Sequence, residues 1–353
     1  MAKVLIIGDL HIGAHSNSIL FMDFMRNYFR NELFPLIEKE GIYAVIQLGD
    51  TLDKRKNIDF LTSAFLIKEW FGWFDEHKIP LFSILGNHDT YYKNTNELAG
   101  IKQYENLFRY VRIISEPENL VMDDTKFMLV PWVCPENKER IKTYLTETKR
   151  TGKYNIICGH FELSGFEIHK DILSKSGTLE TSDFGKTDIV YSGHYHSPSM
   201  KGNIMYIGSP YQLTWSDYGD KKKVLIYDTK QSPEFAKEVF TQSGLYHKII
   251  YQSGMAPELD IPQGSYIKLI VNESDDLLEV FVNKITEKYN LSSCQVIDNT
   301  IDNTSLISEE LDTIELDDPF KILMGSISNI KDSIVSEELL SIYKEATSLT
   351  ENL

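Results

Sequence analysis

Five short apolar runs in this chain end in the same way, and this repetition constrains the fold more than any other feature. A glycine closely follows each run, and an aspartate, an asparagine or a histidine follows the glycine. Because groups just past the carboxyl ends of strands converge on one crevice of an open α/β sheet, we expect these polar side chains to share a site. The five segments are Ile7-Gly8-Asp9-Leu10-His11, Leu48-Gly49-Asp50, Leu85-Gly86-Asn87-His88-Asp89, Cys158-Gly159-His160 and Ser192-Gly193-His194-Tyr195-His196.

The spacing of apolar residues predicts a mixed α/β fold with helices on both faces of the sheet. Helical period, with apolar residues three and four apart, covers Leu20 to Ile37 and Asp59 to Glu76. Val224–Tyr227 and Glu238–Thr241 indicate strands that close the same domain. The strands predicted before them are Val4–Ile7, Tyr43–Leu48, Leu81–Leu85, Phe127–Val130, Tyr154–Cys158, Asp188–Tyr191 and Ile204–Ile207.

The last third of the chain predicts a second domain and an appended tail. Tyr266–Val271 starts a new strand and a helical pattern follows at Leu277–Lys288, which is typical of a small α+β domain. No lysine or arginine occurs from Asp298 to Phe320, where eight residues are acidic, and this composition indicates a solvated linker. The predicted boundaries are 1–242 for the main domain, 243–297 for the small domain, 298–319 for the linker and 320–353 for a helical tail.

The polar residues after the strands form one set of metal-ligand types. Carboxylate, imidazole and amide donors without a thiolate suit Mn²⁺, Fe²⁺ or Zn²⁺ better than Ca²⁺, and the set is too large for one ion. Two ions about 3.5 to 4 Å apart, sharing a carboxylate, would use all the donors and could clamp the oxygens of a reacting phosphoester. Any one segment could be an ordinary turn, but all five in order favour a metal centre. The candidate ligands are Asp9, His11, Asp50, Asn87, His160, His194 and His196.

The net charge of −16, from 36 basic and 52 acidic residues, at first opposes a polyanionic partner. Residues 301–353 alone hold 12 acidic and 3 basic side chains, so most of the excess lies in the tail. Two divalent ions would further reduce the negative charge of the body. DNA therefore remains a candidate partner, with Lys54, Arg55, Lys221 and Lys222 as local basic contacts.

Cysteine usage and hydropathy predict the compartment. Three cysteines without a Cys-x-x-Cys pair give neither a disulfide framework nor a thiolate zinc site, which indicates a reducing environment. No apolar stretch approaches about 18 residues, and the first residues lead directly into a strand without a cleavable leader. We expect a cytoplasmic protein, in the host cytoplasm if it is phage-encoded, with no membrane partner.

The ordered motifs Asp-x-His, Gly-Asp, Gly-Asn-His-Asp, Gly-His and Gly-His-x-His resemble the signature of the calcineurin-like metallophosphoesterases, over residues 4 to about 215. Within that superfamily the chain resembles the SbcD-type nuclease subunits of DNA recombination and repair, in a compact phage-like form. This resemblance implies a sandwich of two packed mixed sheets flanked by helices, a small α+β capping domain and a helical tail. The narrower features are Gly49-Asp50-Thr51-Leu52-Asp53-Lys54-Arg55, Pro131-Trp132, Tyr206-Ile207-Gly208-Ser209-Pro210, Trp215 and Gly219-Asp220-Lys221-Lys222.

The resemblance also implies roles for the motif residues. His88 is expected to contact the scissile phosphate and help charge leave with the departing oxygen, and Asp89 to orient His88. Asp53 departs from the pattern, because cellular SbcD-like enzymes often carry a histidine there, while Arg55 nearby could still meet a phosphate. One ion is expected on Asp9, His11, Asp50 and His196, and a second on Asp50, Asn87, His160 and His194, with Asp50 bridging.

The activity implied is hydrolysis of DNA phosphodiesters with two Mn²⁺ ions, or with Mg²⁺ or another divalent ion in their place. The enzyme would act as a double-strand exonuclease and as an endonuclease on single strands and DNA structures. Two rival functions remain open. An enzyme of the same superfamily could act on a small phosphoester, and a non-catalytic scaffold could keep the fold, although a scaffold would be expected to lose ligands.

The resemblance implies DNA and a separate SMC-like coiled-coil ATPase as partners. No Gly-x-x-x-x-Gly-Lys-Ser/Thr segment occurs in this chain, so an ATP-driven step by that route would not come from it. The tail helices are the expected docking element for that ATPase, as a helix-in-groove contact, with packing on their own catalytic domain as the alternative. A homodimer is also implied by the resemblance. The apolar tail residues expected to dock are Ile322, Leu323, Ile327, Leu339 and Tyr343.

Overall fold

The structure of the protein is a computed structural model that describes residues 2–169, 172–175, 177–273 and 275–299. Residues 1–300 form one compact unit. The predicted linker from residue 300 onward and the predicted tail helices lie outside the described residues. In the described part, no helix is both long and apolar enough to cross a bilayer.

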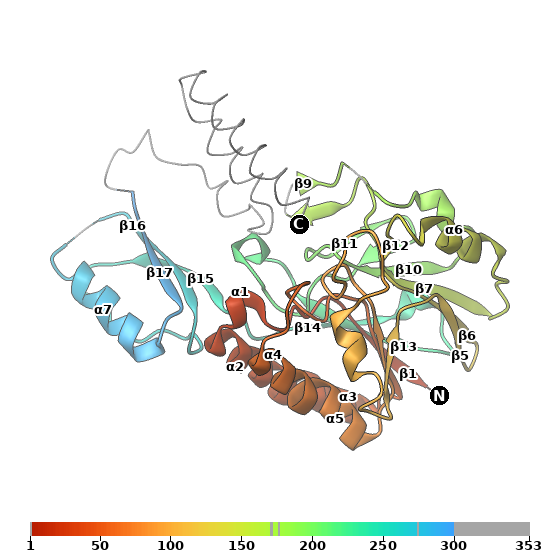
Figure 1. Cartoon of the computed structure of the whole chain (residues 1–353). Coiled ribbons are helices and arrows are strands. Elements are labelled where there is room, and N and C mark those ends of the chain that lie inside the picture. The colour runs from red at the N-terminus through yellow and green to blue at the C-terminus, as the bar shows by residue number, and fades with distance from the viewer. Residues whose placement is uncertain (1, 170–171, 176, 274, 300–353) are drawn as a thin grey trace, which may run out of the picture. The chain divides into compact units, whose positions relative to one another are not determined.

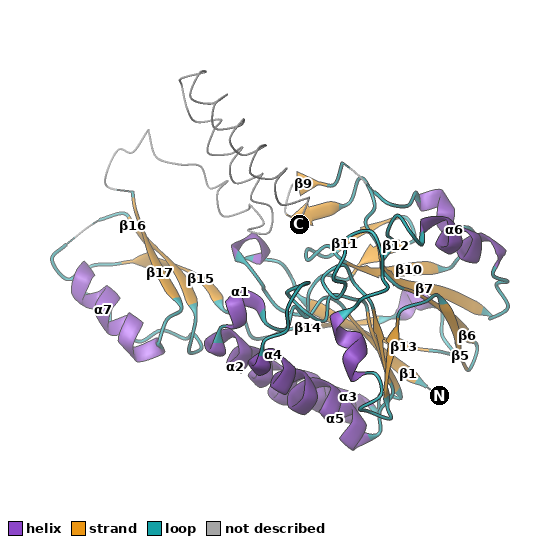
Figure 2. Ribbon diagram, viewed as in Figure 1, coloured by secondary structure: helices purple, strands orange, loops and turns teal. Residues whose placement is uncertain are grey.

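Two six-stranded mixed sheets form the centre of the main domain (Figures 1 and 2). In the first sheet β1 to β4 are parallel, and β13 and β14 extend it in antiparallel fashion. Its order is β14 (Lys237–Phe240), β13 (Lys223–Asp228), β1 (Lys3–Ile7), β2 (Ala44–Gln47), β3 (Leu81–Ile84) and β4 (Val111–Ile114). The order of the second is β11 (Ser199–Lys201), β12 (Ile204–Tyr206), β10 (Ile189–Gly193), β7 (Tyr154–His160), β6 (Thr125–Val130) and β5 (Glu118–Met122).

The side chains of neighbouring strand residues enter different layers of the core. Val4 and Ile6 of β1 belong to the cluster shared by the two sheets, whereas Leu5 and Ile7 pack among the helices. In the second sheet Ile157 faces outward onto a third cluster with Ile141 of helix α6 (Lys138–Glu147). This alternation is the strand period of two, and it buries both faces of each sheet. The predicted sandwich of two mixed sheets flanked by helices is confirmed.

Both long helical predictions are confirmed, and each contains one wider turn. The first comprises α2 (Ile19–Tyr28), the π-helical turn η1 (Phe29–Leu33) and α3 (Phe34–Glu40). The second comprises α4 (Phe60–Phe65), the π-helical turn η2 (Leu66–Trp70) and α5 (Phe71–His77). The two wide turns are joined by Arg30 of η1, whose guanidinium donates to the carboxylate of Glu69 in η2.

Short elements complete the main domain. A two-stranded hairpin consists of β8 (Glu167–His169) and β9 (Ile172–Leu173). Single turns of 3₁₀ helix are η3 (Gly100–Tyr104), η4 (Thr181–Phe184), η5 (Trp215–Asp217) and η6 (Pro233–Phe235). The turn labelled α1 (Ala14–Asn17) is irregular, because His15, Ser16 and Asn17 all have positive φ angles.

A separate three-stranded sheet follows the main domain. Its strands β15 (Tyr246–Tyr251), β16 (Tyr266–Val271) and β17 (Ser293–Asp298) are all parallel, and helix α7 (Leu278–Tyr289) connects β16 to β17. Buried residues of β16 and α7 form a core of their own, including Leu269 and Ile285. We expected a small α+β unit here, and the structure shows a parallel β-α-β arrangement because α7 is the crossover between two parallel strands.

Candidate metal centre and active site

The ends of five strands and the loops that follow them bring all seven predicted ligands to one edge of the sandwich. Loops after β1, β2 and β3 of the first sheet carry Asp9, His11, Asp50 and Asn87. The ends of β7 and β10 in the second sheet provide His160, His194 and His196. Potential ligand atoms of the six aspartates and histidines form two groups of three, and within each group the atoms lie within 4.8 Å of one another. Both sheets of the sandwich therefore contribute to one site, as the sequence predicts.

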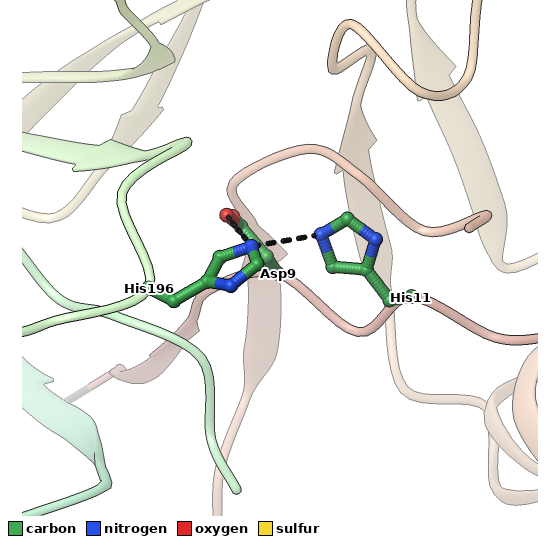
Figure 3. Close-up of side chains that lie close together, drawn as sticks. All are labelled: Asp9, His11 and His196. Atoms are coloured by element: carbon green, nitrogen blue, oxygen red, sulfur yellow. Dashed lines mark hydrogen bonds and ion pairs between the residues drawn. The ribbon is translucent and has the colours of Figure 1, made fainter. Parts of the chain in front are cut away.

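The first group contains Asp9, His11 and His196 (Figure 3). The Nε2 atoms of His11 and His196 lie 3.1 Å apart, and Nε2 of His196 lies 4.0 Å from Oδ2 of Asp9. Figure 3 shows the two imidazole rings directed toward each other with the Asp9 carboxylate beside them. Two imidazole nitrogens and a carboxylate oxygen that face one point are the donor set of an imidazole-rich site for a transition-metal ion.

The second group contains Asp50, His160 and His194. The amide oxygen of Asn87 completes it, 2.8 Å from Nε2 of His160 and 2.9 Å from Nδ1 of His194. His160 donates its Nδ1 hydrogen to the carbonyl oxygen of Leu48, because a carbonyl can only accept, and this leaves Nε2 for a metal.

Asp50 lies between the two groups. Its Oδ2 atom is 3.3 Å from Nε2 of His160 and 3.7 Å from Nε2 of His11. Its other oxygen, Oδ1, accepts the backbone N–H of His88 at 2.8 Å. The carboxylate is therefore fixed in orientation and placed so that one oxygen reaches both groups, which suits the bridging role implied by the resemblance.

The ligand loops have unusual backbone conformations. His11, Asp50 and His194 have φ angles of 48°, 51° and 91°, a region that non-glycine residues adopt only when the surrounding structure enforces it. Gly49 has a φ of 104°, and a Cβ atom there would lie 2.3 Å from Nδ1 of His160. This glycine is required both for its conformation and for the close approach of the ligand.

Burial gives the site strong electrostatics. Asp9 and His160 are 0% exposed. Burial raises the pKa of Asp9 to about 7 against the opposing effect of His160. Burial opposes protonation of His11 and His160, but the neighbouring carboxylates of Asp53 and Asp50 raise each pKa to about 9. Burial and the nearby His160 lower the pKa of His194 to about 3. These buried carboxylates and imidazoles fit divalent metal ions. The positive charge of the ions would neutralise the carboxylates, and the imidazoles would not need to be protonated.

His88 and its neighbours differ in part from the roles expected of them. Nδ1 of His88 donates to the main-chain oxygen of Asp53 at 2.5 Å, which leaves Nε2 available for a substrate. The expectation that Asp89 orients His88 is wrong, because the Asp89 carboxylate accepts the backbone N–H groups of Gly86, Thr51 and Leu52. Asp89 therefore fixes the loops after β2 and β3 around the ligands, and Asp53 holds His88.

Asp53 contacts a candidate ligand, and this contact could not be assigned from the sequence. Oδ1 of Asp53 lies 3.3 Å from Nδ1 of His11 and orients the His11 ring with Nε2 toward His196. The pairing of Ile12 with Leu52 brings the loops after β1 and β2 side by side and places Asp53 next to His11. The only sequence signal for this contact is that Asp53 follows Asp50 by three residues in the same loop.

The four predicted DNA contacts fall into two kinds of environment. Lys54 and Arg55 are partly exposed in the loop after β2, and Lys221 is exposed after η5. Lys222 is only 4% exposed, and its ammonium forms hydrogen bonds inside the protein. The expectation that Lys222 contacts DNA is therefore wrong, because this ammonium would have to break a buried ion pair to reach a phosphate.

Comparison with known proteins gives the same family as the motifs. The profile of the family described as calcineurin-like phosphoesterase matches residues 2–198. "Exonuclease subunit 1" of Enterobacteria phage T4 is 30% identical over 355 residues, covering 98% of this chain and 99% of that protein.

Solved structures show weaker likeness. GAP50, the anchor in the inner membrane complex of Plasmodium, has a TM-score of 0.38 and 13% identity, over 69% of this chain and 90% of that one. A putative 5′-nucleotidase from Staphylococcus aureus has a TM-score of 0.38 and 12% identity, over 68% of this chain and 52% of that one. These scores are too low to carry an argument, so the assignment rests on the family profile and the phage relative. The chain belongs to the calcineurin-like phosphoesterases and is a metal-dependent phosphodiesterase.

Proposed function

We propose that this protein is a DNA nuclease that hydrolyses phosphodiester bonds with two Mn²⁺ ions, as the nuclease subunit of a DNA repair and recombination complex. The observation that carries the proposal is the likeness to a phage exonuclease subunit along nearly the whole length of both chains. The complete set of seven ligand residues supports an active enzyme and disfavours a non-catalytic scaffold.

The residues of the site divide the chemistry between them. Asp9, His11 and His196 would hold one ion, His160, His194 and Asn87 the other, and Asp50 both. When bound, the ions would activate water and neutralise charge that develops on the phosphoryl oxygens. Nδ1 of His88 donates to the main-chain oxygen of Asp53, so Nε2 is the nitrogen that would meet the substrate. As an imidazolium, with a hydrogen on both nitrogens, His88 would deliver the Nε2 proton to the departing oxygen and return to the neutral ring.

The substrate class is tested by comparing DNA with a small phosphodiester. Protein freed of metal by a chelator and resupplied with Mn²⁺ should degrade linear duplex DNA labelled at its ends and cleave single-stranded loops of hairpins. The same protein should also cleave bis-p-nitrophenyl phosphate, which reports the metal centre without any DNA contact. Cleavage of the small ester without measurable action on either DNA would contradict the nuclease proposal and favour the rival enzyme of the same family.

The proposed partner is an SMC-like coiled-coil ATPase that docks on helices within residues 320–353. Support comes from the relative being named as a subunit. The apolar positions Ile322, Ile327 and Leu339, together with the net negative charge of the tail, suit a helix-in-groove contact that is specified by charge.

Deletion of residues 305–353 tests the docking proposal. The shortened chain should keep its activity on bis-p-nitrophenyl phosphate, because every candidate ligand lies before residue 197. It should no longer co-purify with a co-expressed SMC-like ATPase subunit. A shortened chain that still forms the complex would contradict docking through the tail. A homodimer stays a prediction. The molar mass of the purified chain from light scattering would test it.

A further inference from the structure

The loop between β10 and β11 carries two candidate ligands, His194 and His196. Residues outside this loop hold it in place through hydrogen bonds. The carbonyl oxygen of His196 accepts the backbone N–H of Ser209 at 3.1 Å and the ammonium of Lys222 at 2.8 Å. A main-chain oxygen fixed by two donors restricts the peptide that positions the His196 ring. Lys222 thus touches a ligand residue although it is 26 positions away in the sequence.

The ammonium of Lys222 has all its donors engaged inside the protein. Besides the oxygen of His196 it reaches Oδ1 of Asp217 at 2.9 Å and Oδ2 of Asp220 at 3.4 Å. An ammonium has three N–H donors, and three acceptors surround this one. The side chain is only 4% exposed. The ammonium is therefore fixed in position by its three acceptors, unlike the ammonium of a surface lysine.

Asp217 fixes Lys222 from the other side. It is fully buried, and its Oδ2 accepts the backbone N–H groups of Leu213 and Thr214 at 2.8 and 3.0 Å. Burial opposes ionisation, but Lys222 and the other partners hold the pKa of Asp217 at about 2, so the Asp217 carboxyl is ionised. The carbonyl oxygen of Leu213 in turn accepts the hydroxyl of Tyr246 at 2.7 Å, which anchors the far end of this segment.

Asp220 makes a second connection to the ligand loop. Its Oδ2 accepts a hydrogen bond of 2.9 Å from the hydroxyl of Ser197, the residue that directly follows His196. Residues 213–222 therefore hold two consecutive residues of the ligand loop, one through Lys222 and one through Asp220.

We propose that Lys222, paired with Asp217, is a positioning residue for the first metal group of Asp9, His11 and His196. The effect is selective, because the second group receives His160 from β7 and Asn87 from the loop after β3. His194 is held separately, since its backbone N–H donates to the Asp9 carboxylate at 2.9 Å. The inference rests on the two-ion site of the proposed function but not on DNA as the substrate.

The test measures metal binding by the full chain and needs no catalysis. The double variant Asp217→Asn/Lys222→Met removes both charges together, because a single change would leave a buried ion unpaired and could unfold the protein. Calorimetric titration of the chelator-treated variant with Mn²⁺ should show one ion bound as in the wild type and the other about 10- to 100-fold more weakly. His196→Ala identifies which binding step belongs to the first group.

A matched control uses the adjacent buried lysine. Lys223 pairs with Glu238 and has no contact with the ligand loop among the described interactions, so Glu238→Gln/Lys223→Met should bind both ions as the wild type does. Ser197→Ala, which removes only the contact with Asp220, should weaken the same ion by a smaller factor and provides a milder variant if the double variant unfolds.

Two results would overturn the positioning role of Lys222. One is wild-type affinity for both ions in the double variant and in Ser197→Ala. The other is equal weakening of both ions, which would indicate general loss of structure. A wild-type chain that itself binds fewer than two ions would instead refute the two-ion site, so the two failures are distinguishable.

Discussion

His88→Ala is expected to lower the turnover number on DNA by about 10²- to 10⁴-fold, the usual contribution of a positioned proton donor. Metal binding should persist, because the imidazole of His88 is outside both donor groups. The backbone N–H that donates to Asp50 also remains in the variant. DNA affinity should therefore change little while catalysis is lost.

The leaving group provides the sharpest measurement of this role. Departure of p-nitrophenolate needs no proton, so His88→Ala should retain much more activity on bis-p-nitrophenyl phosphate than on DNA. His77→Ala is a matched control, since His77 lies on the outer helix α5 and contacts its own helix at Trp73. Equal losses on both substrates, or loss of Mn²⁺ from the variant, would show that His88 does not act as a proton donor.

Asp50→Asn is expected to abolish activity on every phosphodiester, by at least about 10³-fold, because the chemistry depends on both ions. The substitution keeps the shape of the side chain, and an amide oxygen can still accept from the N–H of His88. It removes the negative charge shared by His11 and His160, whose Nε2 atoms lie 3.7 and 3.3 Å from Oδ2. Turnover of bis-p-nitrophenyl phosphate measures the loss independently of DNA binding.

Asp53→Asn is the matched control for this variant. Asp53 lies in the same loop, and its carboxylate contacts Nδ1 of His11. Its main-chain oxygen, which accepts from His88, is kept in the variant. An intermediate loss is expected, with the affinity for one ion reduced about 10- to 100-fold. If Asp50→Asn retained a tenth or more of the wild-type turnover, the bridging role of Asp50 would be refuted.

The convergence of the candidate ligands could be predicted from the sequence because each lies at the end of a buried strand or in the loop that follows it. The run Val4–Ile7 and its counterparts identify strands by their apolar content, and the topology of parallel strands then brings their carboxyl ends together. The glycines were informative for the same reason, since Gly49 leaves no room for a side chain beside His160. At these positions the local sequence pattern and the arrangement of the strands in the sheets lead to the same site.

Other features depend on three-dimensional contacts that no local pattern records. The partner of Asp89 is a set of backbone N–H groups from two loops, and a side chain's direction in a tight turn cannot be read from its neighbours. Lys221 and Lys222 are adjacent and identical in type, yet one is exposed and the other is buried with Asp217. Strand β5 and helix α6 were not predicted, because β5 is short and α6 is largely polar, and each buries only one face.

Metal stoichiometry tests the central claim most directly. Chelator-treated wild-type protein titrated with Mn²⁺ should bind two ions per chain, and Asp50→Asn should bind neither tightly. Binding of a single ion by the wild type, or two tightly bound ions in Asp50→Asn, would contradict a two-ion centre bridged by Asp50.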